Sequence, residues 1–203
     1  MKEWLENYWY HYKWHTIVAI FLVIVIVFTI SSVVDKKSYS GNVMFVGKTF
    51  IPVTQLEDIK QAFKKVIPDG DELNYSQLHY DPEDPDDYQA NEMAKESLTS
   101  MVVQPYYIYV MSESVYKLYK DSGVFEKLEN IFTSIPKSAI DEYAIRLRDT
   151  KFAQTNAGID SLDEDMVILL KVVPYSISQR TMREENKMYE YHKQIFINIV
   201  EFK

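Results

Sequence analysis

The densest group of side chains that could do chemistry in this sequence is an acidic run at residues 81–87, Asp-Pro-Glu-Asp-Pro-Asp-Asp. Carboxylate oxygens are the ligands that Ca²⁺ prefers in proteins. The residues that could hold such an ion are Asp81, Glu83, Asp84, Asp86 and Asp87. Their order does not match a calcium-binding EF-hand loop, and two prolines interrupt them. A solvated loop that also caps the next helix explains the same residues more simply.

Histidines are the other candidate metal ligands, and the chain has four. His11 and His15 are four residues apart and would share one face of a helix, a geometry that can bind a metal. They stand among tryptophans and tyrosines, so two further aromatic rings at a membrane interface are the simpler interpretation. We therefore expect no metal and no other cofactor.

The sequence contains no motif for nucleophilic, phosphate or dinucleotide chemistry. It has no cysteine, which excludes disulfides, thiol catalysis, thiolate metal sites and a lipoprotein anchor. Its five glycines do not cluster into a phosphate-binding loop, and no serine lies in a Gly-x-Ser-x-Gly setting. We expect a protein that is not an enzyme, with a hydrolase using two carboxylates as the alternative.

The apolar patterns further along the chain predict strands and helices in alternation. Apolar runs predict strands at 42–46, 72–80, 106–111 and 166–173. Helices are expected to begin at a Thr54–Glu57 capping box, at Asp86 or Asp87, at Ser112 and at Glu184. Residues 132–165 are less regular, with a helix capped at Ser138–Asp141 and a strand at 143–147 as options. This order predicts an α/β fold with helices layered on a sheet, and we expect most of the sixteen tyrosines to be core residues.

An α/β fold also predicts where a site would lie, because ligands of open α/β sheets bind beyond the carboxyl ends of the strands. Two predicted strands end at polar or glycine residues. The candidate ligand-binding or partner-binding residues are therefore Gly47, Lys48 and Thr49 after the first strand, and Ser112 and Glu113 after the tyrosine-rich strand.

Residues 16–34 form the longest apolar run, nineteen residues without a charge, a glycine or a proline. As a helix the run would be about 30 Å long, the thickness of a bilayer core. Aromatic residues that favour the lipid headgroup layer precede it: Trp4, Tyr8, Trp9, Tyr12 and Trp14. The pattern predicts a transmembrane helix with an aromatic interfacial belt.

A cleavable signal peptide is the main competing interpretation of this run. Its apolar region would be about 7–15 residues long and would precede an A-x-A cleavage site, which is missing here. We favour an uncleaved signal anchor with the N-terminus inside the cell. The predicted organisation is an interfacial segment at 1–15, a transmembrane helix at 16–34, a linker at 35–41 and one extracytoplasmic domain at 42–203.

Several stretches resemble a known family. The segment 105–129, with its turn at Gly123, Phe125 and Leu128, resembles part of the extracellular solute-binding proteins of ABC transporters. Residues 143–152, the pair Gly158-Ile159 and the block 12–15 before the membrane helix look like single-pass membrane proteins of Gram-positive bacteria with a related domain. The resemblance implies a three-layer α/β domain like one solute-binding-protein lobe. The body is too short for the two lobes that such proteins usually have.

Together these features predict a membrane-anchored, extracytoplasmic binding or accessory subunit of a membrane complex, with an ABC transporter as the complex that the resemblance implies. The expected partners are the lipid bilayer and an integral membrane protein such as a transporter. Nucleic acid is excluded as a partner because the chain has a formal net charge of −8. The alternatives are the membrane-anchored hydrolase and a structural scaffold without a ligand site.

Overall fold

The structure is a computed structural model that describes residues 2–34, 39–84, 86–174 and 179–202. Side chains are described within these ranges except at 2–7, 28–34 and 179. The chain divides into two compact units, Met1–Ser38 and Tyr39–Lys203.

The first unit contains one helix, α1 (Lys2–Val34). Its segment Tyr8–Val27 has a mean hydropathy of 1.6 and none of it is buried, so by length and composition it could cross a membrane. A signal sequence near an N-terminus meets the same criteria. The candidate span overlaps the predicted transmembrane helix at residues 16–27 and also includes part of the predicted interfacial segment. An apolar N-terminal helix is compatible with membrane anchoring.

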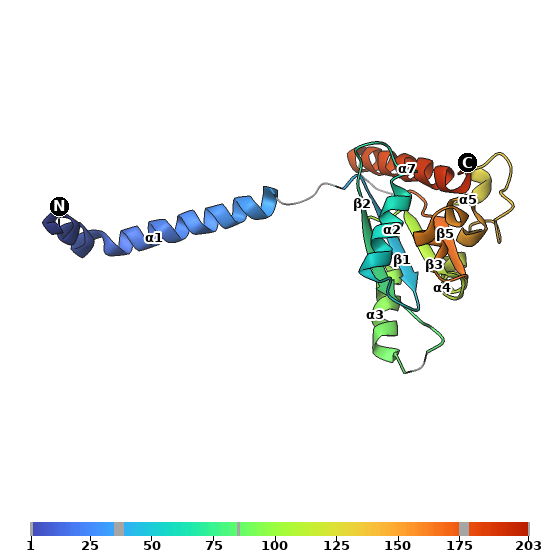
Figure 1. Cartoon of the computed structure of the whole chain (residues 1–203), viewed down its shortest axis with the longest axis horizontal. Coiled ribbons are helices and arrows are strands. Elements are labelled where there is room, and N and C mark those ends of the chain that lie inside the picture. The colour runs from blue at the N-terminus through green and yellow to red at the C-terminus, as the bar shows by residue number, and fades with distance from the viewer. Residues whose placement is uncertain (1, 35–38, 85, 175–178, 203) are drawn as a thin grey trace. The chain divides into compact units, whose positions relative to one another are not determined.

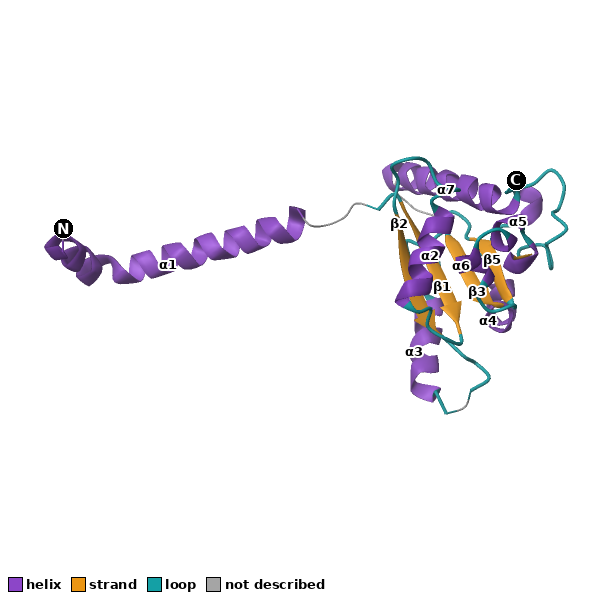
Figure 2. Ribbon diagram, viewed as in Figure 1, coloured by secondary structure: helices purple, strands orange, loops and turns teal. Residues whose placement is uncertain are grey.

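The second unit is built around one five-stranded mixed sheet with the order β2-β1-β3-β5-β4 (Figure 2). The strands are β1 (Gly41–Gly47), β2 (Leu73–His79), β3 (Ile108–Ser112), β4 (Ile145–Arg146) and β5 (Met166–Leu170). β1 runs parallel to both β2 and β3, whereas β5 runs antiparallel to β3 and to β4. The three parallel strands therefore end at the same edge of the sheet.

Helices connect and cover the strands (Figure 1). The longer ones are α2 (Val53–Phe63), α3 (Tyr88–Thr99), α4 (Glu113–Tyr119) and α7 (Gln179–Val200). Short turns of helix complete the unit: η1 (Lys120–Ser122), η2 (Leu128–Asn130), η3 (Leu147–Asp149), α5 (Lys151–Gln154) and α6 (Ala157–Asp160).

Both faces of the sheet are buried. Successive side chains of a strand point to opposite sides, so one strand contributes to the cores on both faces. Phe45 of β1 packs in a core with residues of α2, α5, α6 and α7. Its neighbour Val46 packs in a second core with residues of α3 and α4. The domain is therefore α/β with helices on both faces, as predicted, but the finer resemblance to a solute-binding-protein lobe is not confirmed.

Several local predictions were wrong. Thr54 does not cap α2: the cap is Pro52, two residues earlier, and it makes no side-chain hydrogen bond. Residues 138–141 form turns rather than a helix, and Ala139 makes an isolated bridge with Ile145. Each error concerns a short segment whose conformation depends on distant neighbours more than on its own sequence.

Candidate functional site

The carboxyl ends of β1 and β3 form a topological switch point. The crossover through α2 passes over one face of the sheet and the crossover through α3 passes over the other, and β2 and β3 flank β1 on opposite sides. Such a reversal separates the two connections and leaves a crevice between the strand ends. The predicted residues Gly47 and Lys48, at the end of β1, and Ser112 and Glu113, at the end of β3, therefore lie at the edge where α/β sheets bind ligands.

A pocket of about 220 Å³ lies at this edge, on the face covered by α2. Its lining combines apolar and polar side chains with Gly47: Phe45, Thr49, Phe50, Ile51, Pro52, Gln55, Gln77, Leu78, Ser161, Leu162, Asp163 and Met166. The volume is below the roughly 300–1,000 Å³ typical of sites for drug-sized molecules. The pocket can accept a very small ligand or one inserted side chain.

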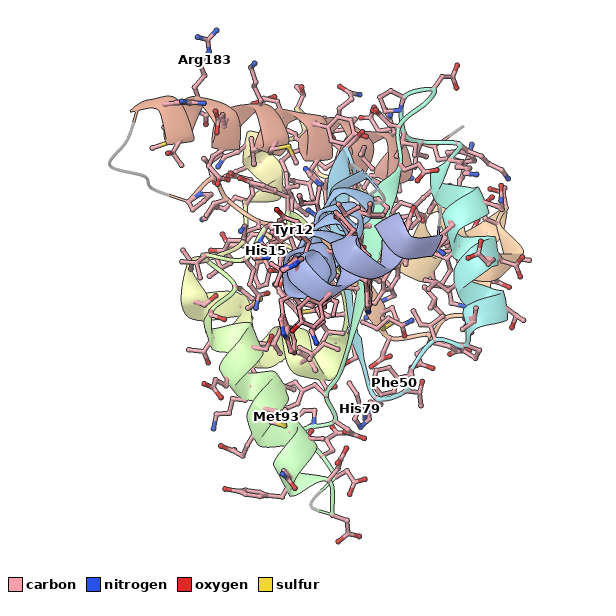
Figure 3. The ribbon with its side chains drawn as sticks, turned by 90° about the vertical axis from the view of Figure 1, so that its left-hand side faces the viewer. Tyr12, His15, Phe50, His79, Met93 and Arg183 are labelled. Atoms are coloured by element: carbon pink, nitrogen blue, oxygen red, sulfur yellow. The ribbon has the colours of Figure 1, made fainter. Side chains whose placement is uncertain are left out.

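The wall of the pocket formed by residues 49–52 is held in place by β2. The Gln77 amide accepts a hydrogen bond from the Ile51 N–H at 2.7 Å and donates one to the Ile51 carbonyl at 3.3 Å. The Phe50 ring stacks on the His79 imidazole with centroids 5.6 Å apart (Figure 3). His79 Nε2 lies 2.6 Å from the Asp87 carboxylate, which fixes the imidazole in turn.

The same wall exposes apolar surface. Phe50 is 65% exposed and Val53, at the start of α2, is 76% exposed. A Phe ring held by stacking in an exposed position loses little conformational entropy when another surface covers it, a property of residues that dominate binding energies.

Charged side chains of both signs lie beside the crevice, each paired with one of the opposite sign. Lys48 Nζ lies 2.5 Å from the Glu83 carboxylate and 3.8 Å from that of Asp81. Glu113 is paired with Lys117 at 2.8 Å and with Arg146 at 2.7 Å. These pairs connect the ends of β1 and β3 to the acidic loop and to β4.

The hydrogen bond to Glu83 raises the pKa of Lys48 and the same bond lowers the pKa of Glu83. The hydrogen bond from Lys117, reinforced by Arg146, lowers the pKa of Glu113. Both carboxyl groups are therefore ionised at neutral pH. A glycosidase-type or protease-type pair needs one carboxyl group with a raised pKa, and these two groups do not supply it.

The five predicted site residues separate into three groups in the structure. Gly47 and Thr49 line the pocket. Lys48 and Glu113 lie in the ion pairs beside it, while Ser112 is buried with its hydroxyl 3.1 Å from that of Ser114.

Sequence reasoning missed the residues that complete the pocket, above all Phe50, Gln77 and the segment 161–163. Phe50 carried a usable signal, because it is a large apolar residue in a predicted loop. The segment 161–163 carried none, since it reaches the pocket only through the packing of α6 on α2.

The acidic loop uses its polar groups for internal structure. Asn91 bonds to the backbone of Asp81 and Asp84, and the Asp81 and Asp84 carboxylates accept the N–H groups of Glu83 and Asp86. The predicted side-chain cap of α3 is wrong, because the cap residue Asp87 makes no capping bond and turns to His79. Among the residues that the structure describes, no group of three or more His, Asp or Glu side chains could hold a metal ion.

The predicted interfacial aromatics lie on α1. Tyr8 and Tyr12 are stacked with centroids 5.4 Å apart, and the Tyr8 hydroxyl lies 3.1 Å from that of Thr16. Trp9 and Trp14 are exposed, and the side chain of Trp4 lies outside the described residues. Tyr12 and His15 are neighbours on this helix, with ring centroids 6.2 Å apart (Figure 3).

Comparisons of the chain with known protein families, with curated proteins and with solved structures found no match.

Proposed function

We propose that this chain is a membrane-anchored binding or accessory subunit of a membrane complex, and that its α/β domain contacts an integral membrane partner through the pocket at the carboxyl end of β1. One observation carries the proposal: exposed Phe50 and Val53 flank a pocket large enough for one side chain. In this arrangement a partner side chain fills the pocket while Phe50 packs against the surface around it.

The charges beside the pocket favour a partner surface over a free anion. Lys48 and Arg146 are each paired with a carboxylate, so the charge of each is already neutralised within the domain. Paired charges at the rim instead set the orientation of an incoming surface and raise the rate of its association. An ABC transporter is the class of complex that the resemblance of residues 105–129 implies.

Site-specific photo-crosslinking in intact membranes tests the contact. A photoreactive phenylalanine analogue replaces Phe50 in the full chain, and a matched chain carries the analogue at Val103. Val103 is 81% exposed and lies in the turn before β3, near the amino ends of the parallel strands. We expect a discrete adduct with a membrane protein from the Phe50 position and at least about tenfold less from Val103. Equal adducts from both positions, or none from Phe50, would contradict the proposal.

The extracytoplasmic placement of the domain needs its own test. The natural chain has no cysteine, so Tyr39→Cys introduces a unique thiol at an exposed position next to β1. A membrane-impermeant maleimide should label this thiol in intact cells. Labelling that requires lysis would place the domain inside the cell and overturn the orientation.

A further inference from the structure

β2 forms one end of the sheet and pairs with β1 on one side only. The Tyr80 N–H donates to the Gly47 carbonyl at 2.9 Å, and the register places Gly47 opposite His79. In a parallel ladder, a residue bonds to the two residues that flank its register partner on the neighbouring strand. Because the register partner of Gly47 is His79, the backbone groups of the even-numbered residues of β2 point toward β1. The backbone N–H and C=O groups of Leu73, Tyr75, Gln77 and His79 therefore point away from the sheet.

Among the described strands, only β1 pairs with β2, so the outer edge of β2 has no strand partner. Across the described part of the chain, the outward backbone groups of Tyr75 and Gln77 make no hydrogen bond. Proteins usually blunt such edges with charged residues, prolines, bulges or very short strands. β2 has seven residues, Leu-Asn-Tyr-Ser-Gln-Leu-His, with no Asp, Glu, Lys, Arg or Pro and an unbroken register with β1. β4, at the other end of the sheet, has only two residues.

We propose that β2 pairs antiparallel with β2 of a second copy of this chain, about a two-fold axis at Ser76. In that register Tyr75 lies opposite Gln77 of the partner subunit, and Leu73 lies opposite His79 of the partner subunit. Each of the four residues with outward backbone groups then lies opposite a partner residue whose backbone groups also point outward. This pairing forms about eight inter-chain hydrogen bonds and one continuous sheet across both domains.

A second copy suits this edge because the strand is complementary to itself. Shifting the register by one residue would place outward backbone groups opposite inward ones and would lose the bonds. The seven residues of β2 carry no formal charge, so the paired strands themselves bring no like charges together. The nearest like charges that would lie opposite each other are Asp71 and Asp81 of the partner subunit, beyond the ends of the two strands. This proposal uses the backbone edge of β2, whereas the pocket uses the side chain of Gln77, and it does not rest on the proposed function.

Cysteine crosslinking tests the register directly, because the natural chain has no cysteine. At the two-fold axis, Ser76 and its copy form a pair without mutual hydrogen bonds, with Cα atoms about 4.5 Å apart, which a disulfide can bridge. Asn74 lies on the same face of the strand, but it and its copy would be roughly 14 Å apart, beyond the reach of a disulfide. In the full chain in mild detergent, Ser76→Cys should form a disulfide-linked dimer on oxidation, and Asn74→Cys should not.

A charge exchange at the same position separates this interface from any contact between anchor helices. Light scattering should find the natural full chain as a dimer, and Ser76→Lys should weaken dimerisation about tenfold because two like charges would face each other. Mixing Ser76→Lys chains with Ser76→Glu chains should restore the dimer, and circular dichroism checks that each variant is folded. A monomeric natural chain, equal crosslinking from positions 76 and 74, or a dimer that Ser76→Lys leaves unchanged would overturn the proposal.

Discussion

At the residue scale, two buried bases, Lys171 and His192, make specific contacts with backbone groups. Lys171 is 1% exposed, and its ammonium donates to the carbonyls of Met101, Val102 and Gln104 at 3.2, 3.3 and 2.5 Å. It also lies 4.9 Å from the centroid of the Tyr107 ring. Burial lowers the pKa of Lys171 to about 8. This lysine satisfies the carbonyl groups of the turn that follows α3.

Replacing Lys171 should therefore destabilise the domain although it removes a buried charge. Lys171→Met leaves three carbonyl groups without their donor, and we expect a loss of about 2–4 kcal/mol in the free energy of unfolding. Urea denaturation measures the change. The control is Lys127→Met, which removes an exposed lysine whose pairs with Glu142 and Glu129 lie in solvent, and it should change stability by less than about 1 kcal/mol. Equal losses in the two variants would contradict the role of Lys171.

His192 links α7 to the first residues of β1. It is fully buried; its Nδ1 lies 2.6 Å from the Met188 carbonyl, to which it donates, and its Nε2 accepts the Asn42 N–H at 3.0 Å. The bond from the Asn42 N–H requires the neutral ring, because only an unprotonated Nε2 can accept it. Burial, with Lys171 nearby, lowers the pKa of His192. Protonation would turn the acceptor nitrogen into a donor facing the Asn42 N–H.

The lowered pKa gives a stability that depends on pH with a defined sign. The unfolded chain takes up a proton near pH 6.5 and the folded chain only at lower pH, so stability is fully present above about pH 6.5 and falls as the pH drops below it. Denaturation at pH 7.5 and pH 5.5 should show this loss. His192→Gln keeps a neutral acceptor for the Asn42 N–H and should reduce the pH dependence of stability. If the variant shows the same pH dependence, other groups than His192 cause it.

At the element scale, close contact between helices positions the pocket. α6 packs on α2 so tightly that a Cβ atom at Gly158 would lie 2.6 Å from the backbone carbon of Asp58. The segment 161–163, which lines the pocket, follows this contact directly. The contact between α6 and α2 therefore positions the wall of the pocket that residues 161–163 form.

Adding one methyl group at this contact should separate the two helices. Gly158→Ala forces backbone atoms apart and should cost about 2–4 kcal/mol of stability. Gly47→Ala is the matched control, because its Cβ would meet nothing closer than 3.9 Å, and its effect should stay within about 0.5 kcal/mol. Thermal unfolding compares the two variants, and a tolerated Gly158→Ala would show that α6 can move away from α2.

The elements that sequence patterns predicted well are those that bury a regular apolar stripe. β1 and β3 lie where their runs of Val, Ile, Met and Phe indicated, and α7 is a helix as predicted, although it begins at Gln179 rather than at Glu184. The segment 132–165 was predicted poorly because β4 has two residues and exists only through its pairing with β5. A strand that short has no periodicity of its own to detect.

At the scale of the whole molecule, the apolar helix α1 is compatible both with a membrane anchor and with a signal sequence. An uncleaved anchor and a signal sequence predict different mature chains. We expect the purified protein to retain residues 1–34 in intact-mass measurement and to stay with the membrane fraction after an alkaline carbonate wash. A mature chain that starts after residue 34 would show that α1 is removed.

Charges in the middle of the run should abolish membrane retention. Ile24→Lys together with Ile20→Lys places two like charges, which cannot pair with each other, where each costs about 2.5–3.5 kcal/mol of insertion free energy. The matched control, Ile24→Leu with Ile20→Leu, keeps the hydropathy and should fractionate as the natural chain does. Retention of the charged variant in the membrane would assign the attachment to the domain instead.

The sequence by itself determined the apolar N-terminal helix, the α/β class and the edge at which a site would lie, because each follows from local composition or from the period of an apolar pattern. Gly47 and Thr49 were predicted in this way and line the pocket, since residues that follow a parallel strand reach the crevice of any such sheet. Only the tertiary structure decided that Gln77 and Phe50 complete the pocket, that Lys48 and Glu113 lie in ion pairs, and that β2 ends the sheet. These facts depend on strand order and on contacts between residues far apart in the chain, which no local pattern encodes.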